Sequence, residues 1–227
     1  MEIKYATLCK QGKRANNEDY LLVEHHPEKN SWMGIVCDGM GGHAKGEVAS
    51  HTVAESIAHY WKEQLDAKDD ETKVMEACNE AYRFFNKKCH KIEMGTTMVM
   101  ASIQDDTVTI AHLGDSRAYI LSKGEKNSHF MTKDHLHTSD GYELIAKCFF
   151  TNHPEVVEPD VHQEKLKEGD KIILCSDGIY KCMSPALLQK ILREGDSLEK
   201  IIENLDMNGD KYGRDNYSAI VLEVTHS

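Results

Sequence analysis

The sequence is short of the features that divide, anchor or target a chain. Its 227 residues contain no Pro/Ser/Gly-rich tract of the kind that links domains, and a chain of this length suits one core. We therefore expect a single domain over residues 1–227. No apolar run approaches the roughly 18 residues that span a membrane, and the N-terminal stretch MEIKYATLCK lacks the apolar segment of a signal peptide. These absences predict a soluble, cytoplasmic protein.

The cysteines lack any pairing pattern. There are seven, an odd number, and no two are spaced as CxxC, which argues against both a disulfide framework and a zinc knuckle. We expect reduced, mostly buried thiols. Cys37 and Cys175 lie in predicted strands just before aspartates, where oxidation would disturb a site. Buried, inert thiols are the favoured interpretation.

Positive charge is also in short supply. Lys and Arg number 27 against 38 Asp and Glu, which gives a formal net charge of −11. This balance disfavours a nonspecific nucleic-acid role, because phosphate binding needs clustered Lys and Arg. Solubility alone can explain an acidic excess, and bound divalent cations would offset part of it.

Hydrophobic periodicity predicts a mixture of strands and helices. Strands are expected at 3–8, 20–23, 32–37, 96–103, 107–114, 117–122, 130–134, 171–175 and from 215 onward, and helices at 48–65, after the acidic run 69–71, at 184–193 and up to residue 205. The three strands between 96 and 122 are expected to form an antiparallel meander. Residues 135–159 show no clear period and are expected to form a loop or small flap.

The stretch VCDGMGGHAKGE (36–47) is the most distinctive in the chain. An apolar strand stops at Asp38, and Gly39, Gly41 and Gly42 follow almost without interruption, which lets the backbone approach a bound ion or phosphate closely. In isolation, Asp38 is better explained as a turn residue that caps a helix starting near Gly46, and only the other aspartates of the chain favour a metal site.

Several predicted strands begin or end at a carboxylate. Asp38, Asp115, Asp177 and Asp215 lie at strand ends, and Asp19 precedes a fifth strand. Sheets collect strand ends in one place, and carboxylates crowded together repel one another, so a stable cluster needs cations. All-oxygen ligands select Mg²⁺ or Mn²⁺ rather than zinc. Two such ions that share an aspartate would lower the pKa of a bound water, which is the chemistry of phosphoester hydrolysis.

Seven motifs in order strengthen this interpretation. They are Arg14 with NED (17–19), DGMGGHAKGE (38–47), GTT (95–97), GDSRAY (114–119), TKDH (132–135), SDG (176–178) and GRDN (213–216). Their order and spacing resemble the metal-dependent type 2C protein phosphatases, particularly the compact bacterial members. The resemblance implies an α+β fold, a four-layer α-β-β-α sandwich of two mainly antiparallel sheets flanked by helices, with metals at one end.

The resemblance also implies a role for each matching residue. Asp38 would bridge two metals, with Asp177 and Asp215 completing the first metal site. The second metal would take the backbone carbonyl of Gly39 and Asp19, with Glu18 beside it. Asp115 with Asp177 resembles the third-metal site of bacterial members. Arg14 would hold the substrate phosphate through its planar guanidinium, and Asn216 would hold the ligands in position.

The resemblance implies a serine/threonine protein phosphatase that binds Mn²⁺ or Mg²⁺. Two ions are implied, and a third is implied by the resemblance of Asp115 and Asp177 to the third-metal site. A metal-bridging hydroxide would attack phosphorus directly, without a covalent enzyme intermediate. Substrates would be proteins carrying phosphoserine or phosphothreonine, opposed by a serine/threonine kinase. We expect a monomer without nucleic-acid or membrane partners.

Two departures from the family pattern affect function. Met40 stands where some members carry a histidine proposed to protonate the leaving group, which leaves four candidates for the general acid: His43, His135, His137 and His153. The flap at 135–157 is shorter than in bacterial members, so substrate preference and third-metal behaviour are open. Phe149 and Phe150, within this region, are expected to pack beneath the loop.

Two rival functions remain. A phosphatase-like protein without effective turnover would bind phosphoproteins and regulate a partner, although every metal-aspartate position is filled. A serine hydrolase would use Ser116 in GDSR, but no downstream histidine has a convincing motif.

Overall fold

The computed structural model describes residues 1–226 apart from 41–44, 67–68, 153–155 and 196. Most strands form two five-stranded sheets. Sheet A contains, in spatial order, β1 (Glu2–Lys10), β14 (Tyr217–His226), β13 (Lys171–Cys175), β7 (Arg117–Leu121) and β8 (Phe130–Met131). Sheet B contains β12 (Asp160–Lys165), β6 (Thr107–Leu113), β5 (Met98–Gln104), β3 (Ser31–Asp38) and β2 (Asp19–His26). Two short pairs are β9 (Leu136–Ser139) with β10 (Tyr142–Ile145), and β4 (Gly95–Thr96) with β11 (Phe149–Phe150).

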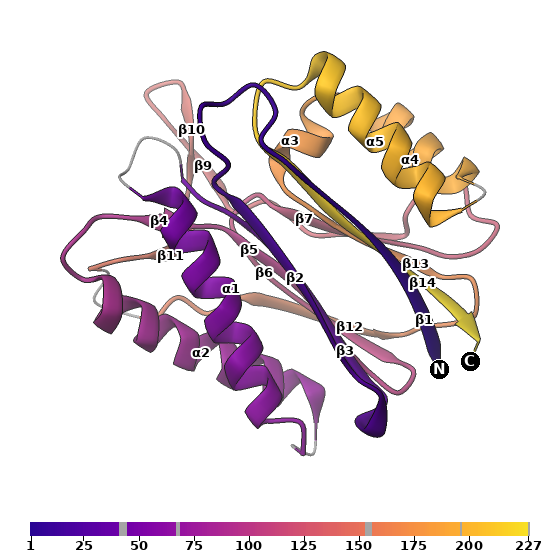
Figure 1. The fold of residues 1–227 in the computed structure, drawn as a ribbon, viewed down its shortest axis with the longest axis horizontal. Helices are drawn as coiled ribbons and strands as arrows, with labels where there is room; N and C mark the ends of the chain where they lie inside the picture. The colour runs from indigo at the N-terminus through magenta and orange to yellow at the C-terminus, as the bar shows by residue number, and fades with distance from the viewer. Residues whose placement is uncertain (41–44, 67–68, 153–155, 196, 227) are drawn as a thin grey trace.

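Helices cover the outer faces of both sheets (Figure 1). The helices are α1 (Gly46–Glu63) and α2 (Asp70–Cys89) over sheet B, α4 (Pro185–Glu194) and α5 (Leu198–Tyr212) over sheet A, and the single turns η1 (Pro27–Lys29) and α3 (Asp177–Tyr180). Neighbouring strands within both sheets are antiparallel. The predicted α+β fold, a four-layer sandwich of antiparallel sheets flanked by helices, is confirmed.

Three buried apolar clusters fill the spaces between these layers. The first lies between α1, α2 and sheet B, the second between the two sheets, and the third between sheet A and the helices α4 and α5. Strand β3 contributes to two of them, since Ile35 faces the helices and Val36 faces the other sheet. A strand that is buried on both faces has apolar residues at successive positions, so residues 32–37 show no alternation of apolar and polar residues.

The two long N-terminal helices follow the predicted periodicity. In α1, Val53, Ile57 and Trp61 are fully buried, as their spacing of four residues requires for one face of a helix. Helix α2 begins after Asp69, whose side chain accepts a hydrogen bond from the Thr72 amide at 2.8 Å. This side-chain cap satisfies one of the free amides of the first turn.

A buried ion pair ties α2 to α1 and β5. Lys73 Nζ lies 2.5 Å from Asp70 Oδ1, and their side chains are only 2% and 4% exposed. Ser102 Oγ donates to Asp70 Oδ1 at 2.8 Å and accepts from Trp61 Nε1 at 2.8 Å. The ammonium also lies 5.0 Å from the centre of the Trp61 ring. The lysine is therefore enclosed by partners from three elements.

The predicted meander is wrong at its third strand. β5 and β6 pair as expected, but β7 pairs with β13 and β8 in sheet A, so the chain crosses between the sheets at 114–116. Gly114 makes this crossing with φ of +106°, and a Cβ there would lie 2.6 Å from the Thr97 side chain. The crossing places Asp115 at the end of both sheets.

The described part of the region predicted as a loop or small flap contains three short strands, β9, β10 and β11. β9 and β10 form a hairpin whose turn, Asp140 and Gly141, has φ of +51° and +83°, as a two-residue hairpin turn requires. Phe149, in β11, is fully buried against Tyr82 and Phe85, which confirms its predicted packing role. Phe150 is half-buried.

Strand β12 was not predicted. Its sequence, DVHQEK, has one apolar residue and contains no fully buried position, because it is an edge strand that pairs only with β6. Hydrophobic alternation cannot identify a strand that buries so little apolar surface.

Both buried cysteines next to the site aspartates behave as predicted. All seven cysteines are free, and Cys37 and Cys175 are fully buried. Burial raises the pKa of Cys175 to about 12 and that of Cys37 well above its ordinary value. Both thiols are therefore held in the unreactive, protonated form.

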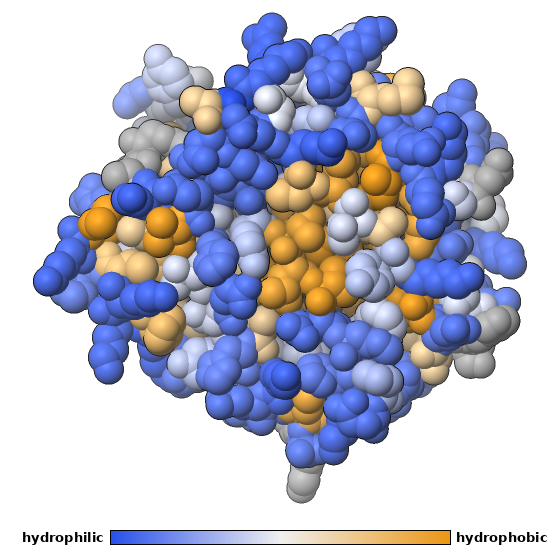
Figure 2. Space-filling model, in the orientation of Figure 1, coloured by the Kyte–Doolittle hydropathy of each residue, from blue (hydrophilic) through white to orange (hydrophobic). Residues whose placement is uncertain are grey.

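β1 and β2 are edge strands of different sheets and run beside each other on one face (Figure 1). Figure 2 shows an apolar area over the centre of this face, bordered by hydrophilic residues. Leu21 and Val23 of β2 are partly buried and pack against the cluster between the sheets. Among the described helices, none is long and apolar enough to cross a membrane.

Candidate metal centre at the end of the sandwich

Asp19 and Asp38 face each other at the end of sheet B. The ladder of β2 and β3 pairs these two residues directly. The Asp38 amide donates to Thr97 Oγ1 at 3.1 Å, and the Asp38 carbonyl accepts from Thr96 Oγ1 at 2.9 Å. The GTT motif therefore fixes the backbone that carries Asp38.

Gly39 is required by close backbone packing. A Cβ on Gly39 would lie 2.3 Å from the Gly46 carbonyl oxygen and 2.7 Å from that of Glu18. The Gly39 amide also donates to the Glu18 carbonyl at 3.0 Å. This glycine joins the end of β3 to the start of α1 and to the segment before β2. The expectations for Gly41, Gly42 and His43 fall outside the described residues.

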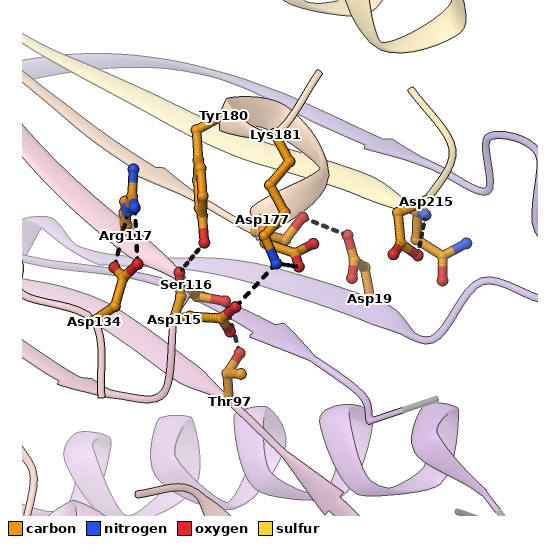
Figure 3. Close-up of polar contacts among 12 residues, drawn as sticks. Asp19, Thr97, Asp115, Ser116, Arg117, Asp134, Asp177, Tyr180, Lys181 and Asp215 are labelled. Carbon is orange, nitrogen blue, oxygen red and sulfur yellow. Dashed lines mark hydrogen bonds and ion pairs between the residues drawn. The ribbon is translucent and has the colours of Figure 1, made fainter. Parts of the chain in front are cut away.

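Asp115 and Asp177 come from the end of sheet A and share one cation. Asp177 starts α3, and Lys181 follows one turn later. Lys181 Nζ lies 2.5 Å from Asp177 Oδ2 and 3.3 Å from Asp115 Oδ2 (Figure 3). Lys181 was not among the site residues predicted from the sequence. The signal that identifies it is its spacing of four residues from Asp177.

Arg14 pairs with the last of the predicted aspartates. Arg14 Nη2 lies 2.6 Å from Asp215 Oδ2, and about half of the arginine side chain is exposed. The hydrogen bond and charge of Asp215 raise the pKa of Arg14 further. The residue expected to bind phosphate and a residue expected to bind metal thus neutralise each other in this structure.

Asn216 connects the two ends of the chain around the site. Its Oδ1 accepts from the Glu18 amide at 3.0 Å, and its Nδ2 donates to the carbonyls of Gln11 and Asn16 at 2.7 and 2.8 Å. These bonds hold the segment with Arg14 and Glu18 against the start of β14.

These residues line one cleft of about 650 Å³. Its floor contains Arg14, Glu18, Asp38, Asp115, Asp177 and Asp215. The β9–β10 hairpin forms another wall with His137, Glu143 and Leu144. Asp19 lies behind the floor, where its Oδ2 accepts from Ser176 Oγ at 2.7 Å. The predicted carboxylates are therefore gathered at one end of the sandwich.

Burial and mutual repulsion oppose ionisation of these carboxylates. Burial, followed by the charges of Asp19 and Asp177, raises the pKa of Asp38 well above its ordinary value. Burial raises the pKa of Asp19 to about 7, although the Ser176 hydrogen bond acts in the opposite direction. Burial and the charge of Asp177 raise the pKa of Asp115, while Lys181 lowers it.

The side chains fit a site for hard divalent cations. Asp19 Oδ1 is buried without a hydrogen-bond partner, directly across the ladder from Asp38, and the neighbouring donors are carboxylate oxygens, which suit Mg²⁺ or Mn²⁺. Within the described ranges, no three Asp, Glu, His or Cys side chains yet converge on one point as ligands. Arg14 and Lys181 instead neutralise part of the charge.

The histidines differ in their access to the cleft. His135 Nδ1 accepts from the Gly114 amide at 3.1 Å, and its ring stacks on His112 with centres 4.4 Å apart, so it has a structural role beside the crossing between the sheets. His137 is exposed and lines the cleft. His43 and His153 lie outside the described residues. His137 is thus the candidate general acid that the described structure places at the cleft.

Ser116 cannot serve as a nucleophile in this arrangement. It is fully buried, and its hydroxyl lies 2.7 Å from Thr97 Oγ1. A nucleophilic serine needs a base beside it and access to substrate. The serine hydrolase alternative is therefore rejected.

Comparison with known proteins identifies the family to which this site belongs. Residues 10–213 match the family model described as Protein phosphatase 2C. The chain belongs to the protein phosphatase 2C family. A member from Listeria innocua, the serine/threonine phosphatase stp, is 30% identical over 92% of this chain and 91% of its own length.

Mycobacterial family members are similar in both sequence and structure. The serine/threonine protein phosphatase PstP of Mycobacterium tuberculosis is 29% identical over 98% of this chain and 45% of its own length. A crystal structure of the PstP catalytic domain in complex with two manganese ions superimposes with a TM-score of 0.81, at 28% identity and 98% coverage of both chains. The sandwich and its carboxylate-lined end are thus those of a metal-dependent phosphatase family.

Proposed function

We propose that residues 1–227 act as one catalytic unit that hydrolyses phosphoserine and phosphothreonine on proteins with two Mn²⁺ or Mg²⁺ ions. The observation that carries this proposal is the gathering of Glu18, Asp38, Asp115, Asp177 and Asp215 with Arg14 around one open cleft. The names of the Listeria and Mycobacterium relatives support the substrate class, and the two manganese ions of PstP support the cofactor.

The proposed ligands come from both sheets. Asp38 would serve both ions, Asp177 and Asp215 would serve the first, and Asp19, Glu18 and the Gly39 carbonyl would serve the second, directly or through water. When bound, the ions supply Lewis acidity that activates water and stabilises negative charge on phosphate. Burial, and after it the charges of neighbouring aspartates, raise the pKa of Asp19 and Asp38, and bound cations would favour the ionised form of both.

Arg14 is proposed to bind the substrate phosphate. It lies at the rim of the cleft and is half-exposed, so its planar guanidinium can form two parallel hydrogen bonds to phosphate oxygens. Its present partner, Asp215, is a proposed metal ligand. If Asp215 held a cation, its contact with Arg14 would weaken and the guanidinium would be available to phosphate.

The β9–β10 hairpin is proposed to contact the protein around the phosphorylated residue. His137, Glu143 and Leu144 line the cleft from this hairpin and are exposed. His137 provides an imidazole that can protonate the leaving alkoxide, a role for which the Met40 side chain has no proton. The shortened flap thus retains a wall that faces substrate.

Cellular context follows from the same chemistry. A phosphatase of this type acts against a serine/threonine kinase, and we propose that it does so as a monomer in the cytoplasm. The free state of all seven cysteines supports a reducing compartment. The formal charge of −11 disfavours nucleic-acid substrates.

Phosphate release from a phosphothreonine peptide tests the proposed function. We expect release that requires Mn²⁺ or Mg²⁺, stops on chelation and is lost in Asp38→Ala. Asp106→Ala is a matched control, because Asp106 is an exposed aspartate paired with Lys165 away from the cleft. No release by a folded, Mn²⁺-loaded protein would favour the phosphoprotein-binding alternative and sink the proposal.

A further inference from the structure

Lys181 places a permanent positive charge between two carboxylates of the cleft. Its Nζ contacts one oxygen of Asp177 and one of Asp115, at 2.5 and 3.3 Å, while both aspartate side chains are at most 15% exposed. Figure 3 shows the side chain reaching from the end of α3 toward this pair. Burial lowers the pKa of Lys181, but the contacts with Asp177 and Asp115 outweigh it and raise the pKa. A lysine ammonium is charged at neutral pH, so the contact with the two carboxylates is one of opposite charges.

The backbone on both sides of this contact is held in place. The Lys181 amide donates to the Asp177 carbonyl at 2.9 Å, which closes the turn of α3. Tyr180 Oη donates to the Asp115 carbonyl at 2.9 Å. The guanidinium of Arg117 lies 3.6 Å from the centre of the Tyr180 ring and makes two 2.8 Å bonds to Asp134. These contacts hold the backbone of Asp115, Asp177 and Lys181 in place. The ion pairs of Lys181 are therefore part of an ordered site and not a chance surface contact.

Charge balance at this end of the sandwich accommodates two divalent ions. Apart from Glu143 on the hairpin wall, six carboxylates gather at or directly behind the floor of the cleft: Glu18, Asp19, Asp38, Asp115, Asp177 and Asp215. In the described part of the cleft lining, the cationic side chains are Arg14 and Lys181. The fully ionised group therefore carries four net negative charges, which two divalent ions neutralise. A third ion at Asp115 and Asp177 would have to displace a charged lysine that already bonds to both.

We propose that the Lys181 ammonium takes the place of a third divalent ion at the Asp115–Asp177 pair, so that this phosphatase binds two metal ions rather than three. The inference rests on the proposed function for the first two ions. It assigns Asp115 to holding Lys181 rather than to holding metal. One oxygen of Asp177 bonds to Lys181, and its other oxygen is left for the first metal site.

Manganese stoichiometry tests this assignment without relying on activity. Isothermal titration calorimetry and elemental analysis after desalting are run on the full chain and on three variants: Lys181→Ala, Lys181→Arg and Lys165→Met. We expect two Mn²⁺ ions per chain in the parent, in Lys181→Arg and in Lys165→Met, and three in Lys181→Ala. Lys165 is the matched control because it pairs with Asp106 on the surface.

The affinity for the additional ion gives a second measure. We expect Lys181→Ala to bind it at least about tenfold more tightly than the parent, since the variant removes a like charge in direct contact with both ligands. Circular dichroism confirms that each variant is folded. Three ions in the parent, or equal stoichiometry in the parent and Lys181→Ala, would overturn the inference.

The same samples separate this inference from the proposed function. Two ions in the parent and three in Lys181→Ala, without phosphate release from phosphothreonine peptide by any protein, would overturn the phosphatase proposal and support the role of Lys181. Phosphate release by a parent protein that binds three ions would support the phosphatase proposal and overturn the role of Lys181. Absence of Mn²⁺ binding in all four proteins would overturn both.

Discussion

Lys73 and Lys181 each pair with an aspartate one helical turn away, but they lie in opposite environments. Lys73 is 2% exposed and is enclosed by Asp70, Gln104 and the Trp61 ring. Lys181 is 56% exposed and lies at an open cleft among carboxylates. The same chemical pair therefore serves two purposes. In the core it joins elements permanently, and at the cleft it neutralises charge where other cations also have access.

The largest effect on stability should come from breaking the enclosed pair. Asp70→Ala leaves the Lys73 ammonium buried without its counterion, and we expect a loss of about 3–5 kcal/mol in the free energy of unfolding. Urea unfolding followed by circular dichroism measures it. Turnover per folded molecule should be unchanged, because the pair is remote from the cleft.

A double variant sharpens this part of the comparison. Asp70→Leu combined with Lys73→Met replaces both charges with apolar groups of similar size, and such replacements of buried pairs are often neutral or stabilising. Recovery of most of the stability lost in Asp70→Ala would show that the unpaired charge causes the loss. A double variant as unstable as Asp70→Ala would instead assign the loss to packing.

The next largest effect on stability should come from Asp19, a buried carboxylate beside the cleft that forms no ion pair with Arg14 or Lys181. The pKa of Asp19 is raised from 3.8 to about 7, so the folded, metal-free protein holds a proton that the unfolded chain releases. The resulting stabilisation is complete below about pH 4 and is lost as the pH rises through 7. We expect the thermal midpoint of the metal-free protein to fall across this window.

Two controls test the origin of that pH dependence. Asp19→Asn should flatten the fall in the midpoint, and Mn²⁺ should abolish it in the parent protein. Differential scanning fluorimetry in matched buffers measures both. A midpoint that rises from pH 4 to pH 7 without metal would contradict the assignment to Asp19.

Arg14 allows a smaller, functional test of the open cleft. Loss of charge-assisted hydrogen bonds to phosphate is worth about 1.5–3 kcal/mol, so Arg14→Ala should lower kcat/KM for a phosphopeptide by about 10- to 100-fold. Arg14→Lys should restore little of it, since an ammonium cannot form the paired contact. Steady-state kinetics decide the point, and full activity in Arg14→Lys would argue against a bidentate contact.

The smallest effect should come from an exposed pair. Lys165 Nζ lies 2.8 Å from Asp106 Oδ2, with side chains 75% and 50% exposed. Lys165→Met should change the free energy of unfolding by at most about 1 kcal/mol, with unchanged turnover. A loss comparable to that of Asp70→Ala would remove the distinction between enclosed and exposed pairs.

Residues whose role depends on local sequence could be predicted without a structure. The strand 32–37, its terminal Asp38 and the tightly packed Gly39 follow from an apolar run, a carboxylate and a glycine in succession. The convergence of Asp115, Asp177 and Asp215 follows from their positions at strand ends. Local pattern suffices here because the backbone itself delivers each side chain to the cleft.

Features that depend on distant partners could not be predicted. β7 crosses into sheet A because its pairing with β13 is decided by residues more than 50 positions later. The contacts of Arg14 with Asp215 and of Lys181 with Asp115 also join distant segments. β12 buries too little apolar surface to leave a periodic signal. In each case the determining interaction lies outside any local window.

The position of β14 has a consequence for protein synthesis. This last strand lies between β1 and β13 in sheet A, and Asp215 and Asn216 lie directly before it. A growing chain that has not yet reached these residues leaves its first strand without a partner and the loop around Arg14 without the bonds of Asn216. The sheet and the segment around Arg14 are therefore completed only after residues 215–226 have been synthesised.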